Sequence, residues 1–346
     1  MNNTINIKGA YGEENFGDDL LMKVFENFFY QELDCNVDFH GLNAEYPKNI
    51  LEHYTYMQEK LDDGLLVYGG GTQFFSFSNV NLFSYKGFLL SLKRIVKDVI
   101  YNEAKITPAY YLGIGLGPFS DTYIEKKTKK ALANAPFISV RDTISFQYAQ
   151  KWGIDVTYGA DVVFSKYFQL PVKIITPENK KKKIGVIVRD WNWTDEGRAY
   201  LDKIKRLKDR EDFDVQFIIF SSLKDRFCIE HFNYDDTLIW NPELYSIDEF
   251  IVELNQFDIF ISARYHGAII ATLLSKPVIC VEVESKINGL VNDIPELNLW
   301  KQPFKEDDLN KMLSKLDYDV DYSKSTQKLS NRANNMLATF KREINE

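Results

Sequence analysis

Short apolar runs alternate with amphipathic segments along the first half of the chain. The apolar runs predict strands, because strands buried on both faces of a parallel sheet read as continuously hydrophobic. Apolar residues at helical spacing predict helices near residues 18–30 and 47–60. Strands are expected at residues 4–7, 36–39, 65–68, 109–112 and 137–140. Most of them run into glycine-rich or charged turns, as expected where functional loops gather on one edge of a sheet.

The second half of the chain repeats this alternation after an interruption. Residues 169–183 contain two prolines and four consecutive lysines, which is typical of a linker. The lysines are expected to be solvated, and steering of an acidic ligand is the alternative. Beyond them, strands are expected at residues 184–188, 215–220, 257–262 and 278–283, and helices near 195–208, 247–256 and 268–274.

Two such series predict an α/β protein with two Rossmann-like, doubly wound domains that face each other across a cleft. The N-terminal domain is expected to span residues 1–172 and the C-terminal domain residues 183–324. Residues 325–346 are expected to form a terminal helix that packs back across the domains. B-type glycosyltransferases share this architecture, which therefore names no reaction by itself.

Composition excludes several classes of protein. At 346 residues the chain is too long for one ordinary core, and its net charge of -8 argues against a nucleic-acid partner. The three cysteines form no CxxC pair and are expected to be buried thiols in a reducing compartment. We assign no metal ligands, because no group of carboxylates, histidines or cysteines has the spacing of metal ligands, and the sequence leaves metal dependence open.

The sequence favours a cytoplasmic location. The N-terminus lacks the basic start and apolar core of a signal peptide, and no stretch approaches the roughly 20 apolar residues needed to span a bilayer. Aromatic and aliphatic side chains crowd residues 74–90, with several basic residues nearby. A buried helix is the favoured interpretation of this crowd, and peripheral contact with the inner face of the membrane is the alternative.

The strongest candidate for chemistry is the predicted strand-to-helix turn Arg264-Tyr265-His266-Gly267. The start of a helix offers unpaired N–H groups to an anion, Arg264 adds a forked cation, and Gly267 permits close approach. The imidazole of His266 suits proton transfer. The structural alternative is that Arg264 pairs with a neighbouring carboxylate and His266 caps the helix. The other three histidines lack such surroundings and are expected to have surface or core roles.

The order of several short motifs resembles a known family. The motifs are Asn15-Phe-Gly-Asp-Asp19, Gly69-Gly-Gly-Thr72, Gly113-Ile-Gly-Leu-Gly-Pro118, Ser139-Val-Arg-Asp142, Gly159-Ala-Asp161 and the segment from Ser262 to Lys286. Each is weak alone, but the ordered set resembles the polysaccharide pyruvyl transferase family over roughly residues 10–290. The resemblance implies a glycosyltransferase-like fold and transfer of pyruvate from phosphoenolpyruvate to two hydroxyls of a sugar. The products are a cyclic ketal and phosphate, and the implied setting is the biosynthesis of bacterial surface polysaccharides.

The residues of the C-terminal half suit such a donor. Phosphoenolpyruvate carries a phosphate and a carboxylate, so its pocket needs several cations and N–H donors. Arg264, Lys286 and Arg189 are the expected cations, with Gly267 beside them. His266 is the expected general acid or base, because the donor carbon must gain a proton and the attacking hydroxyl must lose one. No cofactor is expected besides the donor substrate.

The opposite wall is expected to bind the acceptor, a sugar or a lipid-linked oligosaccharide. Amide and carboxylate groups can hydrogen-bond sugar hydroxyls, and glycines allow a close approach. Asp18 and Asp19 are equally explained as acidic residues favoured at a helix N-terminus. The expected acceptor-binding residues are Asn15, Gly17, Asp18, Asp19, Gly70 and Gly71.

The sequence leaves alternative roles for two residues and allows two other functions. Arg141 is expected either to reach the donor or to brace the domain interface, and Asp161 either to hold a loop or to meet a ligand. The same fold also suits a glycosyltransferase in which Arg264 and Lys286 bind the diphosphate of a nucleotide sugar. A third possibility is a non-catalytic protein that binds a glycan.

Overall fold

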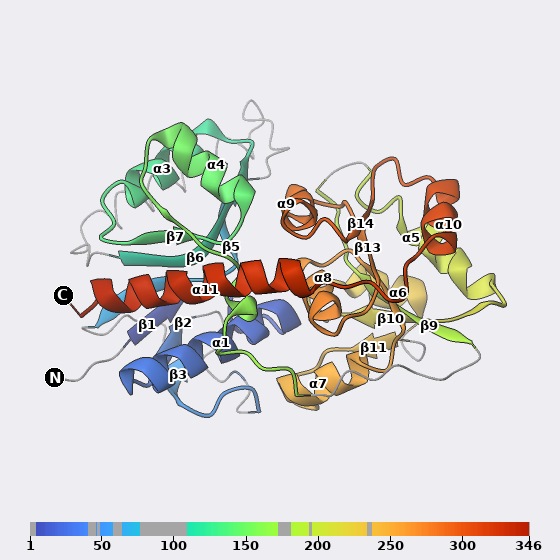
Figure 1. The fold of residues 1–346 in the computed structure, drawn as a ribbon, viewed down its shortest axis with the longest axis horizontal. Coiled ribbons are helices and arrows are strands. Elements are labelled where there is room, and N and C mark those ends of the chain that lie inside the picture. Colours follow the sequence, from blue (N-terminus) through green and yellow to red (C-terminus); the bar gives the residue numbers. More distant parts are fainter. Residues whose placement is uncertain are drawn as a thin grey trace, which may run out of the picture.

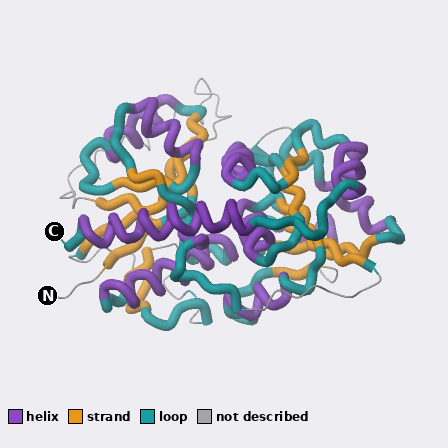
Figure 2. Tube along the Cα trace, in the orientation of Figure 1, coloured by secondary structure: helices purple, strands orange, loops and turns teal. Residues whose placement is uncertain are grey.

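The chain forms two parallel β-sheets, each flanked by helices (Figure 1). The computed structural model describes residues 5–40, 46, 49–57, 64–76, 109–171, 181–193, 196–233 and 237–345. Figure 2 shows the strands of each sheet enclosed by helices and loops. The predicted fold class of two Rossmann-like α/β domains is therefore confirmed.

The N-terminal sheet has the strand order β3-β2-β1-β4-β6-β7-β8, with β5 paired to β6. All of its strand pairs are parallel. The strands are β1 (Ile5–Lys8), β2 (Val37–His40), β3 (Tyr54–Met57), β4 (Leu65–Gly69), β5 (Thr72–Ser76), β6 (Ala109–Phe119), β7 (Ile138–Val140) and β8 (Thr157–Tyr158).

The C-terminal sheet has the strand order β11-β10-β9-β12-β13-β14, and its pairs are parallel as well. Its strands β12 and β13 are buried along their whole length, which explains why their sequences are apolar apart from Ser262. The strands are β9 (Lys182–Val188), β10 (Phe213–Ile219), β11 (Thr237–Ile239), β12 (Ile259–Ser262), β13 (Val278–Val281) and β14 (Asn298–Trp300).

Helices follow most strands and cover the sheets. The α-helices are α1 (Phe16–Leu33), α3 (Thr122–Leu132), α4 (Thr143–Trp152), α5 (Leu201–Lys205), α6 (Arg226–Phe232), α7 (Ile247–Leu254), α8 (Tyr265–Leu273), α9 (Ser285–Asp293), α10 (Glu306–Ser314) and α11 (Ser323–Glu343). The 3₁₀ turns are η1 (Val162–Phe164) and η2 (Arg206–Asp209). Within the described residues, no helix combines the length and apolar character needed to cross a bilayer.

Strand order also shows where a ligand is expected. In each sheet the order reverses at one point, between β1 and β4 in the first and between β9 and β12 in the second. In open α/β sheets, ligands bind beyond the carboxyl ends of the strands at such points. The residues that follow these four strands are therefore the first place to look for a site.

The terminal helix α11 ties the two domains together. It follows α10 of the C-terminal domain and returns across the N-terminal sheet (Figure 1). Phe340 packs edge-on against Phe29 and Tyr110, with ring centroids 5.9 Å apart in both pairs. Arg332 donates to the Gly159 carbonyl and lies 2.9 Å from a carboxylate oxygen of Asp293 in α9. The helix therefore contacts elements from both halves of the chain.

Several expected elements differ from the structure. A helix was expected near residues 47–60, but Tyr54–Met57 forms strand β3 and pairs with β2, so this prediction was wrong. The helix expected at 195–208 is reduced to α5 and η2. In the aromatic crowd, Phe74 belongs to β5 and packs against Tyr68 and Tyr111; residues 77–90 lie outside the described part. The expected linker is shorter, because β9 already begins at Lys182.

Candidate active site

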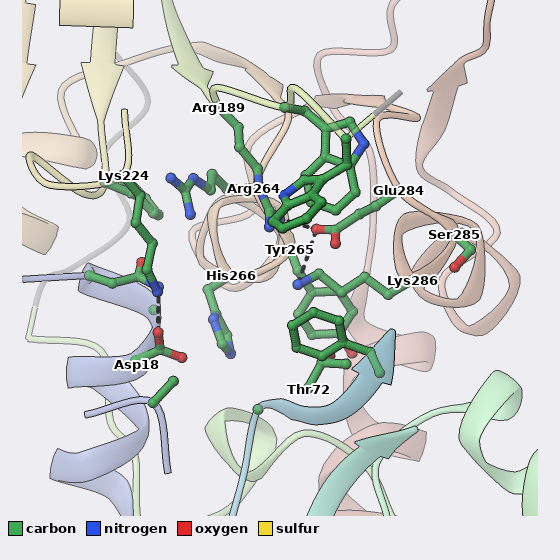
Figure 3. A pocket seen from close by; sticks show the side chains of 18 of the residues that line it. Asp18, Thr72, Arg189, Lys224, Arg264, Tyr265, His266, Glu284, Ser285 and Lys286 are labelled. Atoms are coloured by element: carbon green, nitrogen blue, oxygen red, sulfur yellow. Dashed lines mark hydrogen bonds and ion pairs between the residues drawn. The ribbon is translucent and has the colours of Figure 1, made fainter. Parts of the chain in front are cut away.

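A cavity of about 510 Å³ opens between the two domains at the carboxyl ends of their strands. One wall comes from the segments after β1, β4 and β7 and from the end of β6. The other wall comes from the loops after β9, β10, β12 and β13. The positions at which the strand order reverses in the two sheets therefore both border this cavity. Figure 3 shows polar side chains from both walls pointing into it. The lining includes Asn15, Gly17, Asp18, Gly71, Thr72, Arg141, Arg189, Arg264, Tyr265, His266, Glu284, Ser285 and Lys286.

The turn after β12 has the local structure that its sequence predicted. Ser262 ends the strand, and its hydroxyl accepts from the Arg264 N–H at 3.2 Å and donates to the Arg264 carbonyl at 2.8 Å. Helix α8 then begins at Tyr265 without a side-chain cap, so its first N–H groups are available to a ligand. Gly267 does not line the cavity: a Cβ there would lie 2.6 Å from the Ser262 hydroxyl. That glycine allows the helix to pack on its strand.

His266 lies where the two domains touch. The imidazole lines the cavity, and its Nε2 atom lies 3.4 Å from a carboxylate oxygen of Asp161, which belongs to the N-terminal domain. A Cβ placed on Gly17 would lie only 2.2 Å from Nδ1 of the same ring. Gly17 is therefore required for room beside the imidazole, and His266 does not cap the helix through its side chain.

Arg141 braces the interface between the domains. Its guanidinium donates to Asp161 at 2.8 Å and to the Thr72 hydroxyl at 2.9 Å, and it lies over the Tyr265 ring at 4.5 Å. The side chain is almost fully buried, and it also lines the cavity. Both roles considered for Arg141 are thus compatible with its position. Asp161 is not part of the lining, but it contacts Arg141 and His266, which are.

Arg264 points toward the cavity but already has a carboxylate partner. Its guanidinium forms a close ion pair with Asp225, which is fully buried and precedes α6. The other Asp225 oxygen accepts from the Asp190 N–H at 2.9 Å. Desolvation opposes the charge on Arg264, but Asp225 outweighs it and raises the pKa of the guanidinium. The pairing considered as an alternative is therefore present, and it fixes the cation at the edge of the cavity.

The two other expected cations share a single carboxylate. Arg189, after β9, forms a close ion pair with Glu284, and Lys286 lies 3.0 Å from the same residue. Burial, together with Arg189 and Arg141, lowers the pKa of Lys286 to about 8, although Glu284 opposes this effect. Helix α9 begins at Ser285 and has no side-chain cap. The cluster of Arg189, Glu284 and Lys286 thus places two cations and a free helix start beside one another (Figure 3).

The N-terminal wall begins at the start of α1. The Asn15 amide donates to the Asp18 carboxylate at 2.5 Å, and both side chains line the cavity. Gly71 also lines it, whereas Gly70 packs against Leu21 and Phe25 and does not. The structure therefore brings Asn15, Asp18 and Gly71 together with the residues expected on the donor side.

Contacts at the start of α1 hold the two walls together. The Phe16 N–H donates to the Phe220 carbonyl at 2.9 Å, and Asn15 forms an isolated bridge with Ser221. Glu13 also forms a close ion pair with Lys224 of the C-terminal domain. The cavity is therefore formed by residues of both domains, which these contacts hold together.

Asp19 does not line the cavity. It is fully buried between the domains, where one oxygen accepts from the Tyr46 hydroxyl at 2.9 Å and from Trp240 Nε1 at 2.7 Å. Burial raises the pKa of Asp19 to about 8 from 3.8, against the opposing effect of these two hydrogen bonds. Its position makes Asp19 part of the domain interface.

This buried carboxyl is expected to make the stability of the protein depend on pH. Because the folded state holds the proton more tightly, the free energy of unfolding should fall as pH rises from about 4 to about 8. Asp19→Asn removes the titration and keeps an acceptor for Trp240. We expect the variant to gain roughly 2–4 kcal/mol relative to wild type between pH 5 and pH 8. Denaturant unfolding across this range measures the difference, and a constant difference would contradict the interpretation.

Several residues that line the cavity or hold its side chains were not anticipated from the sequence. Asp225 and Glu284 neutralise the expected cations, and Thr72 holds Arg141. Trp191 and Trp193 follow β9 and line the cavity near Arg189. Glu284 could have been predicted from the sequence as a partner of the cations, because it follows β13 and stands two residues before Lys286. Asp225 had no such signal, since 39 residues separate it from Arg264.

Metal ligands are not grouped at this site. Within the described residues, no three histidine, cysteine or acidic side chains are arranged so that they could hold an ion. The three cysteines are buried as free thiols.

Comparison with known proteins identifies the family. The model of the family described as polysaccharide pyruvyl transferase matches residues 15–285, which is well over half of the chain. The chain belongs to the polysaccharide pyruvyl transferase family. No functionally curated protein shows significant sequence similarity to it. The matched region runs from Asn15 to Ser285 and thus contains most of both cavity walls of this pyruvyl transferase family member.

Solved structures show what the family member shares in fold. A complex of S. aureus MnaA with UDP superposes with a TM-score of 0.55 at 13% identity, covering 98% of this chain and 94% of that one. A putative UDP-N-acetylglucosamine 2-epimerase from Listeria monocytogenes gives 0.54 at 10% identity, with 99% and 97% covered. At these identities the similarity shows the two-domain Rossmann-like fold alone. Family membership supports a transferase that acts on a sugar or polysaccharide acceptor.

Proposed function

We propose that this protein transfers pyruvate from phosphoenolpyruvate to two hydroxyls of a sugar and forms a cyclic ketal. The observation that carries the proposal is the position of His266. It stands in an interdomain cavity with Arg264, Arg189 and Lys286 on its own domain and with Asn15 and Asp18 on the other. A proton-transfer group, an anion site and a polar acceptor wall are thereby adjacent.

The anion site suits a donor that carries both a phosphate and a carboxylate. Arg264 and Arg189 are held by carboxylates, so their positions are defined before a ligand arrives. The uncapped starts of α8 and α9 add N–H donors near the same cations. Lys286, whose pKa is lowered to about 8, gains a second partner besides Glu284 when an anion enters, and its charged form is then favoured further.

The reaction needs proton transfer at two points. A proton added to the methylene carbon of phosphoenolpyruvate makes the neighbouring carbon electrophilic, and a sugar hydroxyl attacks that carbon as it loses its own proton. The carbon–oxygen bond to phosphate then breaks, phosphate leaves, and the second hydroxyl attacks the same carbon and loses its proton. His266, which lines the cavity, is the group that we propose gives or takes these protons. No cofactor or metal is part of this proposal.

The acceptor is proposed to lie against the N-terminal wall. The Asn15 amide and the Asp18 carboxylate are hydrogen-bonded to each other and face the cavity, where they can bind sugar hydroxyls. A sugar carried on a lipid would bring the protein to the inner face of the membrane. A free or nucleotide-linked sugar would not.

Phosphate release gives the direct test. Purified protein is incubated with phosphoenolpyruvate and a panel of lipid-linked, nucleotide-linked and nitrophenyl sugars, and the products are analysed by mass spectrometry. We expect phosphate release together with the added mass of pyruvate on one class of acceptor. A rise in the thermal unfolding temperature of the protein with nucleotide sugars, but not with phosphoenolpyruvate, would favour a glycosyltransferase instead. Sugar binding without use of either donor would indicate a non-catalytic protein.

The glycine beside His266 gives a second prediction. Gly17→Ala places a methyl group 2.2 Å from Nδ1, so the imidazole must move. A displacement on this scale is expected to lower kcat by about 10²-fold. Steady-state kinetics and thermal unfolding measure activity and stability separately. The matched control is Gly289→Ala in α9, where the new Cβ meets its nearest neighbour, Ile144, at 3.4 Å and turnover should persist. Equal kinetics in both variants would remove Gly17 from the mechanism.

A further inference from the structure

The two ring nitrogens of His266 have different surroundings. Nε2 is shielded from solvent and makes no hydrogen bond to any residue that the structure describes. The carboxylate oxygen Oδ2 of Asp161 lies 3.4 Å away. This separation exceeds the ordinary N–H···O distance of about 2.9 Å and corresponds to an ion-pair contact. Catalytic hydrogen bonds are often long before substrate binds and tighten afterwards. Nε2 therefore faces a carboxylate.

Nδ1 faces the acceptor wall. Gly17, at the start of α1, lies beside this atom, because a Cβ on Gly17 would come within 2.2 Å of Nδ1. Gly17 lines the cavity next to Asn15 and Asp18. A ligand held by these two residues would approach the imidazole from the side of Nδ1. The buried nitrogen thus meets Asp161, while the other is left beside the cavity.

Asp161 is fixed in position and remains charged. It is fully buried at the start of η1, where Oδ1 accepts from the Val163 N–H at 3.2 Å and Oδ2 accepts from Arg141 at 2.8 Å. Burial alone would raise its pKa, but His266 and Arg141 outweigh this effect and hold the pKa of Asp161 at about 2. A carboxylate of this kind accepts a hydrogen bond from Nε2 and does not take the proton.

We propose that Asp161 is a positioning residue that fixes the tautomer of His266, with the proton on Nε2, so that Nδ1 exchanges protons with the substrate. The inference rests on the proposed function and adds a second residue to its mechanism. With Nε2–H directed at the carboxylate, the neutral ring has its lone pair on Nδ1 and acts as a base there. The protonated ring returns the proton from the same atom. Because Asp161 and His266 belong to different domains, their pairing requires the packed arrangement of both.

Imidazole ¹⁵N NMR tests the tautomer without any substrate. The chain has four histidines, so His266→Ala assigns the resonance of His266 by its loss. At a pH where the ring is neutral, we expect the wild-type protein to carry the proton on Nε2. Asp161→Asn should shift the spectrum toward the Nδ1–H form, because a carboxamide can also donate to Nε2. A wild-type ring protonated on Nδ1, or an unchanged spectrum in Asp161→Asn, would overturn the proposal.

A double-mutant cycle tests whether Asp161 acts through His266. Asp161→Asn is expected to lower kcat by about 10²-fold or more in the wild-type background and to have no further effect in His266→Ala. Asp161→Glu, which retains the carboxylate, should recover part of the loss. Equal effects of Asp161→Asn in both backgrounds would mean that it acts independently, and the proposal would fail. If Asp161→Asn does not fold, the proposal is still tested by the tautomer of His266 in the wild-type protein and by the kcat of Asp161→Glu. If the protein transfers no pyruvate, the proposed function fails, but the NMR experiment still tests the tautomer of His266 because it uses no substrate.

Discussion

His266→Ala is expected to lower the rate of pyruvyl transfer by about 10²–10⁴-fold while the protein stays folded. In the proposed mechanism the imidazole, which lines the cavity, moves protons between the donor carbon and the sugar hydroxyls, and such a group contributes about 10²–10⁴-fold to a rate. The ring borders the cavity, so its removal enlarges a space that water can already enter. Phosphate release from phosphoenolpyruvate with a responsive acceptor measures the loss, and thermal unfolding checks the fold.

His231→Ala is the matched control for this variant. His231 lies in α6, 3.3 Å from Asp202, and takes no part in the lining of the cavity. Its replacement should leave turnover close to that of wild type. Wild-type rates in His266→Ala, or equal losses in both variants, would remove His266 from the mechanism.

The fold was largely predictable from the sequence because strands of parallel sheets are buried on both faces. Strands β12 and β13 are apolar apart from Ser262, and their short lengths, with one glycine and one proline between them, left little choice of element. The segment of β3 was misassigned because Tyr54–Met57 is short and lies within a stretch that also fits helical spacing. Its pairing with β2 is a tertiary contact, and local pattern does not contain it.

The motifs that line the cavity were predictable, whereas the direction of single side chains was not. Asp18 and Asp19 are neighbours in α1, and successive helical residues point about 100° apart. Only the packing of α1 against both domains decides that Asp18 faces the cavity and that Asp19 turns to Trp240. The same reason separates Gly71, which lines the cavity, from Gly70, which packs against Leu21.

Ion-pair partners that lie far apart in the sequence could not be predicted either. Arg264 was expected to offer its charge to a ligand, and a carboxylate partner was considered without a candidate. The structure supplies Asp225 from the start of α6, brought close because β10 and β12 flank β9 in the same sheet. Such a pair depends on strand order, which single-sequence patterns do not specify.

Asp225→Ala is expected to destabilise the protein by about 3–5 kcal/mol. The substitution leaves the buried guanidinium of Arg264 without its counter-charge and the Asp190 N–H without its acceptor. Breaking one side of a buried ion pair costs more than the pair contributes, because the remaining charge stays desolvated. Denaturant unfolding measures the loss. Activity should fall as well, since Arg264 loses the partner that fixes it at the cavity.

Asp212→Ala provides the matched control, because Asp212 pairs with Arg210 at 2.6 Å near the surface. An exposed pair contributes about 0–1 kcal/mol, so this variant should remain close to wild type in stability. Replacing both buried partners, with Asp225→Leu and Arg264→Met, should recover much of the stability lost in Asp225→Ala but not the activity. Similar stability losses in Asp225→Ala and Asp212→Ala would show that the buried position of the Arg264 pair carries no special cost.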